Sequence, residues 1–404
     1  MENFQEILDS YQGARIKVIG AGGGGSNAVQ HMVNMGVKGV DFAIANTDIQ
    51  AITESTVPEK IQLGIKLTRG LGAGANPEVG RKAAEESIEA IENAVRGYDL
   101  VFIAAGLGGG SGTGSAPVIA EVARRMGSLT VAVVTLPFGF EGRPRMKKAI
   151  EGKRALTEQV DTIITIPNDR LTGHVASLGK KFNMKKAMEE VNNVLLQAVT
   201  GITNLITRPG LINLDFADVK TVMSIRGASL MGMGIGVGED RIRQATEAAM
   251  KNPLLTHDIK GAKGLLFNIT GNDNLEYEDF IEANEVISAY VDEEECEYMV
   301  GTVLDETIPE DTVYVTVVAT GFSDNVAEEV KPKLSQNNRL VNSLQDRESR
   351  KVEMERERER AAVTSPSYEE KAVAQEEDDY ITKEMNNIFE SLDYPSFMRK
   401  FGRK

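Results

Sequence analysis

The chain has 404 residues, 41% of them hydrophobic, which is enough for two domains with buried cores and additional segments. Its net charge of −15 argues against broad binding to nucleic-acid backbones, which needs clustered cations. The single cysteine, Cys296, rules out an internal disulfide framework, and the lack of a long apolar run or a typical signal peptide leads us to expect a cytoplasmic protein.

The first expected strand covers residues 16–19 and runs into a glycine-rich segment, GAGGGGSN, at residues 20–27. Glycine has no Cβ, so consecutive N–H groups can converge on an anion at the positive end of the following helix. The spacing of Gly20, Gly22 and Gly25 also fits the dinucleotide fingerprint, with Asp41 or Asp48 near the distance of a ribose-binding acid. This segment alone leaves an NAD-dependent oxidoreductase open.

A second glycine-rich segment, GLGGGSGTG, covers residues 106–114, between an apolar run at 100–105 and a helical pattern that begins at Ser115. Two phosphate-type loops on strand-to-helix turns predict one polyphosphate held from two sides. The sequence has no GxxxxGK[ST] motif, so a P-loop NTPase is not supported.

Further apolar runs at residues 40–45, 129–135 and 162–166 alternate with helical patterns at 78–95 and 117–126. This rhythm predicts a parallel sheet covered by helices on both faces, with ligands bound beyond the carboxyl ends of its strands. Residues 184–206 then predict a long, largely buried helix, which Pro209 and Gly210 terminate. Its apolar stripe includes Met184 and Met188.

The second half of the chain predicts another α/β unit. Helical patterns lie at residues 239–250 and 277–289, and strand-like runs lie at 264–269, 298–304 and 312–319. From residue 323 the chain is polar with interleaved charge, which predicts a tether without a packed core. At the end, apolar residues recur at helical spacing among basic ones, which predicts a recognition peptide: Tyr394, Phe397, Met398 and Phe401.

Five motifs closely resemble the tubulin/FtsZ family, and within it the bacterial cell-division GTPases: GAGGGGSNAV, GLGAGANPEVG (residues 70–80), AGLGGGSGTGSAP, FEGRPR (140–145) and NLDFADVKTVM (213–223). The resemblance covers roughly residues 13–322 and a short C-terminal segment. It implies a Rossmann-type parallel-sheet GTPase domain (1–182), a long central helix with its connection (183–212) and a second α/β domain (213–322). A flexible charged linker (323–392) and a partner-binding peptide (393–404) follow.

The same resemblance implies GTP as substrate, Mg²⁺ as its companion ion with ligands that the motifs do not identify, and a set of nucleotide-contacting residues. Glu141 is expected at the ribose, Arg145 at the nucleoside, and Asn192 at the guanine edge, where family members usually have aspartate. Asparagine accepts without a full charge, so guanine preference is expected to be weaker. Nearby Met188 fits either the base face or the core. The remaining contacts are expected in three loops: Gly22, Gly23, Gly24, Gly25, Ser26 and Asn27; Ala73 and Gly74; Gly109, Gly110, Ser111, Gly112 and Thr113.

Asp215 and Asp218 follow a predicted helix about 34 Å long and should emerge far from their own phosphates. Taken alone, two such acids favour an ordinary role as helix caps or solvated side chains. The family motif implies instead that they complete the site of a neighbour stacked head to tail, with Asn213 helping to hold the water that attacks the phosphate.

We therefore expect a self-assembling GTPase that forms the division ring beneath the inner membrane. Residues 393–404 should bind a membrane-tethering adaptor, so that membrane contact is indirect. The oxidoreductase and a nucleotide-regulated scaffold without turnover are the alternatives.

Overall fold

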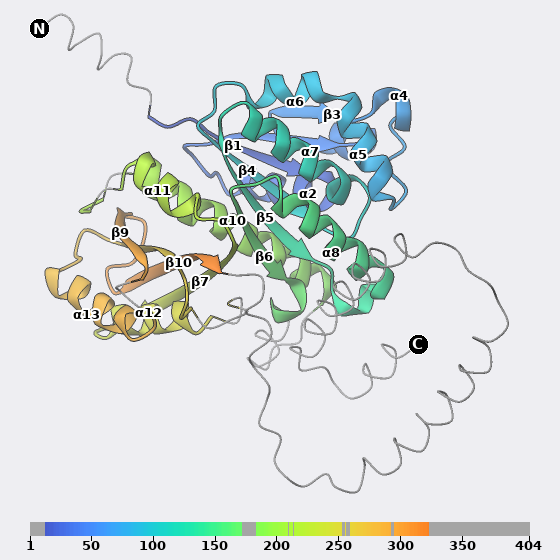
Figure 1. The fold of residues 1–404 in the computed structure, drawn as a ribbon. Coiled ribbons are helices and arrows are strands. Elements are labelled where there is room, and N and C mark those ends of the chain that lie inside the picture. Colours follow the sequence, from blue (N-terminus) through green and yellow to red (C-terminus); the bar gives the residue numbers. More distant parts are fainter. Residues whose placement is uncertain are drawn as a thin grey trace, which may run out of the picture.

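The computed structural model describes residues 13–171, 183–208, 210–212, 214–252, 255, 259–291 and 295–322. The predicted linker and recognition peptide, and both ends of the predicted first domain, lie outside these residues. Within them runs a ten-stranded sheet in the order β3-β2-β1-β4-β5-β6-β7-β10-β8-β9 (Figure 1). No helix in these residues is long and apolar enough to cross a membrane.

The first six strands are parallel and follow the predicted apolar runs, with β3 as an additional short edge strand. They are β1 (Ile16–Ala21), β2 (Asp41–Asn46), β3 (Glu59–Gln62), β4 (Leu100–Gly106), β5 (Leu129–Leu136) and β6 (Thr162–Pro167). Near-continuous apolar sequence is required because helices cover both faces. One face packs against α2 (Gly22–Asn34) and the central helix. The other packs mainly against α5 (Pro77–Glu86), α6 (Ile88–Val95), α7 (Ser111–Arg125) and α8 (Arg143–Thr157).

Two sequence-based helix boundaries are wrong. The pattern at residues 78–95 is two helices, α5 and α6, separated at Ser87, whose hydroxyl accepts the Gly64 N–H at 3.0 Å. Helix α7 begins at Ser111 rather than at Ser115, and α2 already begins at Gly22. Residues 22–27 of the first predicted glycine loop and residues 111–114 of the second are therefore the start of a helix, and the free amides belong to helix N-termini. The short helices α3 (Ile49–Glu54), α4 (Ile65–Thr68) and the 3₁₀ turn η1 (Gly139–Glu141) complete this half.

The predicted central helix is α10 (Met184–Thr207), which begins at Asn183, where the side chain accepts the Lys186 N–H at 2.9 Å. Asn193 Oδ1 lies 2.7 Å from His31 Nε2 on α2, and Thr207 packs against Gly39, which precedes β2. The helix thus runs beside α2 toward the amino ends of the parallel strands. Its first turns are less buried than predicted, because Met184 and Met188 are 51% and 42% exposed.

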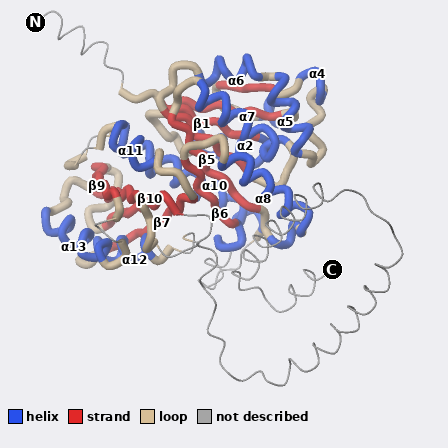
Figure 2. Tube along the Cα trace, viewed as in Figure 1, coloured by secondary structure: helices blue, strands red, loops and turns tan. Residues whose placement is uncertain are grey.

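The second half joins the same sheet through two residue pairs between β6 and β7 (Ala228–Val237). It contains α11 (Phe216–Met223), α12 (Arg241–Met250), β8 (Gly264–Gly271), α13 (Tyr277–Ser288), β9 (Glu297–Leu304) and β10 (Thr312–Phe322). Figure 2 shows strands in the interior of both halves and helices outside them. The apolar pattern of β7 is interrupted by alternate glycines, so the sequence did not predict this strand. These glycines let α12 lie directly on the strand: a Cβ on Gly234 would be 1.9 Å from the Ala245 carbonyl oxygen.

Candidate nucleotide site

The two predicted glycine loops touch each other through their backbones. Gly22 has a φ of +66°, and a Cβ built on it would lie 2.3 Å from the Gly112 nitrogen. A third loop reaches the same place, because a Cβ on Gly110 would lie 2.8 Å from the Asn76 nitrogen and 2.9 Å from the Ala73 Cβ. Segments that are far apart in the sequence therefore meet beyond the carboxyl ends of β1 and β4, as predicted.

Parts of this meeting point are open and rich in backbone donors. A Cβ on Gly23, Gly74 or Gly109 would meet no atom within 4 Å. The residues that precede α2 and α7, Ala21 and Gly110, make no side-chain capping hydrogen bond, so the first amides of both helices remain available to an anion. These features fit a bound polyphosphate. Gly25 has a packing role instead, since a Cβ there would lie 2.1 Å from the Ala104 oxygen.

The predicted hydroxyl residues of the loops differ in what they contact. Thr113 is buried, and its hydroxyl accepts the Gly108 N–H at 2.8 Å, so it holds the second loop in shape. The Ser111 hydroxyl lies 2.6 Å from that of Thr47, a buried residue at the end of β2 that sequence analysis missed. The buried Ser26 hydroxyl has no hydrogen-bond partner within the described ranges, and neighbouring Asn27 is exposed.

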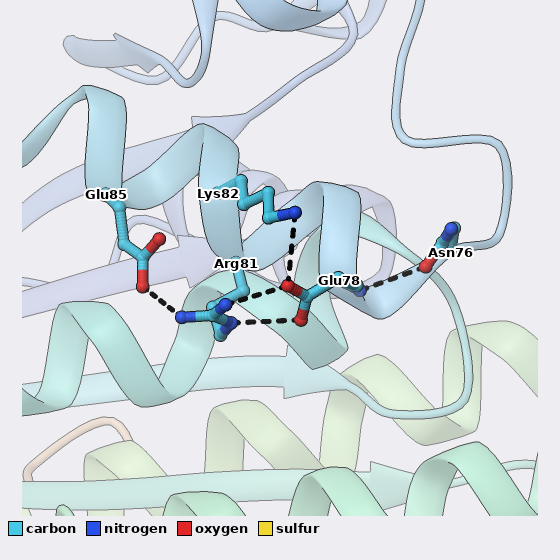
Figure 3. Close-up of polar contacts among 5 residues, drawn as sticks. All are labelled: Asn76, Glu78, Arg81, Lys82 and Glu85. Carbon is cyan, nitrogen blue, oxygen red and sulfur yellow. Dashed lines mark hydrogen bonds and ion pairs between the residues drawn. The ribbon is translucent and has the colours of Figure 1, made fainter.

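The third loop leads directly into α5. Asn76 Oδ1 accepts the Glu78 N–H at 3.0 Å and so caps this helix (Figure 3). On the exposed face, Arg81 pairs with both Glu78 and Glu85, and Lys82 lies 3.5 Å from Glu78. The hydrogen bond from Arg81, with the charges of Arg81 and Lys82, lowers the pKa of Glu78 to about 2. The end of the loop is thus fixed to a helix whose first turn carries an ionised Glu78 carboxylate at neutral pH.

Glu141 and Arg145 lie beside the second loop. Arg145 Nε is 2.9 Å from Glu141 Oε2, and Glu141 Oε1 accepts the Phe138 N–H at 2.9 Å. A Cβ on Gly108 would lie 2.8 Å from the Arg145 carbonyl oxygen, so the start of α8 packs against that loop. The structure therefore places the pair next to the second glycine segment.

Asn168 is a candidate ligand-binding residue that the sequence did not predict. It follows β6 directly, is 7% exposed, and its Oδ1 is a buried acceptor without a partner in the described part of the chain. Neighbouring Asp169 accepts the Gly139 N–H at 2.8 Å, which ties this segment to the turn that carries Glu141. A polar residue directly after a strand, at the edge where ligands bind, was the signal available in the sequence.

Asn192 is half-buried on α10, and its side chain makes no hydrogen bond to any described residue. The next residue, Asn193, instead holds α10 to α2 through His31. With 42% of its surface exposed, Met188 is not a core methionine. Both side chains therefore remain available to a ligand on the first turns of α10.

Asp215 and Asp218 are not near the glycine loops. They cap α11 reciprocally: Asp215 Oδ1 accepts the Asp218 N–H at 2.8 Å, and Asp218 Oδ2 accepts the Asp215 N–H at 3.1 Å. The capping interpretation is correct, yet each carboxylate uses one oxygen and keeps the other. Helix α11 ends against the opposite edge of the sheet, where the hydroxyl of Thr162 at the start of β6 bonds the Met223 carbonyl. Asn213, the third predicted catalytic residue, lies outside the described residues.

Comparison with known proteins identifies this architecture. Residues 15–176 match the GTPase domain of the tubulin/FtsZ family, and residues 227–323 match the C-terminal domain of the FtsZ family. An FtsZ dimer from M. jannaschii is 43% identical, with a TM-score of 0.73 over 79% of this chain and 91% of that one.

Two more distant structures, both from Haloferax volcanii, share the fold. GDP-bound CetZ1 is 20% identical, with a TM-score of 0.66 over 77% of this chain and 95% of its own. CetZ2, solved as a GTPγS-bound protofilament, is 19% identical, with a TM-score of 0.62 over 76% and 93%. None of these matches supports the oxidoreductase alternative. The chain belongs to the tubulin/FtsZ family and is a GTPase that carries the FtsZ type of C-terminal domain.

Proposed function

We propose that the chain assembles head to tail into filaments, and that GTP held by the glycine loops of one subunit is hydrolysed with the help of Asp215 and Asp218 of the next. The observation that carries this proposal is the position of the acids at the opposite edge of the sheet from the loops. The connecting helix α10 has 24 residues, or about 36 Å. Within one subunit the acids cannot reach the phosphates, whereas a heterologous contact between copies brings them together.

Exposed apolar side chains lie near the glycine loops and near the two acids, and they support such a contact between subunits. Near the third loop, Ile65 and Leu71 are 60% and 86% exposed. At the other end, Leu211 and Ile212, just before the acids, are 55% and 42% exposed. The backbone of Ile212 is fixed by hydrogen bonds to Thr302 on β9, of 2.8, 3.0 and 3.4 Å. Each end therefore offers a small apolar surface next to its half of the site.

In the proposed mechanism, the loop amides and the N-termini of α2 and α7 stabilise negative charge on the transferring phosphoryl group. The free carboxylate oxygens of Asp215 and Asp218 orient and polarise the attacking water, and Asn213 helps to hold it. Glu141 and Arg145 bind the ribose and nucleoside, while Asn192 and Asn168 read the base. Mg²⁺, when bound, neutralises phosphate charge. The described residues contain no group of three or more histidine, cysteine or acidic side chains that could hold a metal.

The cellular role follows from the same proposal. Filaments would act in cell division, in the cytoplasm beneath the membrane, and residues 393–404 would bind a membrane-tethering adaptor through the linker 323–392. We also propose that the GTPase unit extends over residues 1–182 and the second unit over 213–322, with 183–212 between them. The net charge of −15 supports partners other than nucleic acid.

The test is sedimentation of the full chain with GTP, with GDP and without nucleotide, alongside phosphate release. If the site forms between subunits, the hydrolysis rate per molecule rises from near zero once the protein concentration exceeds that needed for assembly. A rate per molecule that is independent of concentration would contradict the shared site. Binding without turnover under all conditions would favour the scaffold alternative.

A further inference from the structure

The third loop contains a strained turn at the candidate nucleotide site. The Asn76 N–H donates to the Ala73 carbonyl at 3.0 Å and closes a four-residue turn, in which Gly74 and Ala75 both have a φ of +57°. Positive φ at both central positions is the pattern of a type I′ turn, which favours glycine or asparagine. Ala75 and Arg69 are the non-glycine residues with positive φ among those described. Strain of this kind persists where surrounding contacts impose it.

The middle of this turn has one side-chain hydrogen-bond partner within the described ranges. Lys148 Nζ, on α8, donates to the Ala75 carbonyl at 2.6 Å. The ends of the turn are fixed separately: the Gly72 N–H donates to the Thr47 carbonyl at 3.2 Å, and Asn76 caps α5. Lys148 therefore contacts the non-glycine residue of the turn, Ala75, whose positive φ is the least favourable backbone conformation there. The same helix packs against the second loop through Arg145.

We propose that Lys148 is a positioning residue that holds the Ala73–Asn76 turn in its strained conformation, so that the turn meets the terminal phosphate and the triphosphate is bound in preference to the diphosphate. This inference deepens the proposed function and rests on it, because it requires the turn to lie beside the terminal phosphate. The open side of Gly74 supports that position. Lys148 acts through Ala75, so it is distinct from a lysine that contacts phosphate directly.

The physical reason is a conformational equilibrium. Without the lysine, the favoured state of Ala75 is at negative φ, which moves its carbonyl and the neighbouring amides away from Gly110. A triphosphate must then restore the turn before it binds well, and its apparent affinity falls by the fraction of molecules in the competent state. A diphosphate lacks the terminal phosphate that meets the turn, so its binding affinity falls little. Glycine at position 75 would adopt positive φ without strain, so it should make the lysine dispensable.

The experiment measures equilibrium binding of GDP and of a non-hydrolysable GTP analogue to the full chain, at concentrations below assembly. The variants are Lys148→Met, Ala75→Gly and the double variant. The matched control is Lys66→Met, which removes the same charge from an exposed side chain of α4. We expect Lys148→Met to weaken binding of the analogue by roughly tenfold and binding of GDP by less than about twofold. The double variant should recover to within about threefold of Ala75→Gly, and Lys66→Met should resemble wild type.

Several results would overturn the inference. Equal losses for both nucleotides would mean that Lys148 acts through general charge or stability, and a double variant as weak as Lys148→Met would mean that it does not act through Ala75. Unchanged binding in Lys148→Met would remove its role altogether, and thermal melting of that variant shows whether a loss reflects misfolding. If the wild-type chain bound neither nucleotide, the proposed nucleotide site itself would fail, which is a different outcome from failure of the lysine alone.

Discussion

Exchanging Asp218 for asparagine removes a negative charge at the start of α11 while preserving the local hydrogen bonds. The asparagine Oδ1 can still accept the Asp215 N–H, and its own N–H can still donate to Asp215 Oδ1, so the reciprocal cap remains. Asp218→Ala would instead lose the hydrogen bond that Asp218 accepts from the Asp215 N–H, at a cost of about 0.5–1.5 kcal/mol in stability. Asp218→Asn therefore isolates the chemical role. We expect unchanged GTP binding, because α10 separates the acid from its own loops, and a loss of hydrolysis on the order of 10²- to 10⁴-fold.

A second inactive variant makes the test decisive. A Cβ on Gly109 meets no atom within 4 Å, so Gly109→Asp should place a carboxylate beside the second loop without a clash and repel the phosphates. This variant has intact acids and a blocked pocket, whereas Asp218→Asn has an intact pocket and lacks the acid. When they are mixed, the pocket of one and the acid of the other form a complete site. Random pairing in an equal mixture gives up to about one quarter of the wild-type rate per subunit.

Phosphate release from the two proteins, alone and mixed, measures this recovery, and co-sedimentation of a labelled pair shows that they assemble together. Wild-type chain diluted to the same number of complete sites is the reference. Hydrolysis within one subunit predicts that the mixture is no faster than the sum of its parts. That result, with co-assembly demonstrated, would refute the shared site.

Three further predictions concern the base, the tail and the thiol. Asn192→Asp should tighten binding of GTP and raise the preference for GTP over xanthosine triphosphate by roughly tenfold, since a charged hydrogen bond contributes about 1.5–3 kcal/mol before desolvation. Unchanged affinity ratios in competition binding would place residue 192 away from the base. Deleting residues 393–404 should leave GTP hydrolysis and assembly near wild type while abolishing adaptor binding, and strong tail-dependent flotation with anionic liposomes would argue for direct membrane contact instead. Burial raises the pKa of the Cys296 thiol to about 11 from the usual 9.0, so its contribution to stability is present below pH 9 and is lost as pH rises toward 11. At pH 8, disulfide reagents should modify Cys296 about 100-fold more slowly in native than in unfolded protein, and equal rates would show that the thiol is not protected.

The sequence by itself determined the elements whose burial is periodic along the chain. The runs that became β1, β4, β5 and β6 are apolar because two helical layers cover them. The apolar stripe of α10 likewise reflects the packing of this helix against the sheet. The glycine segments predicted where backbone amides would face a ligand. Motif resemblance added the expected roles of Glu141, Arg145 and Asn192, which residue spacing alone does not specify.

Only the tertiary structure decided which of these features lie together. The contact of Gly22 with Gly112, and the bond from Lys148 to Ala75, join residues that are 90 and 73 positions apart. No local pattern records such pairs, because periodicity reports that a residue is buried and not what buries it. The same holds for Ser87, whose hydroxyl contacts Gly64 where a helix was predicted to continue, and for β7, whose glycines fit α12. Asp215 and Asp218 look like helix caps in sequence and in structure. The sequence predicted the length of the helix that precedes them, and the folded chain showed where that helix leads, since α11 lies at the opposite edge of the sheet from the loops.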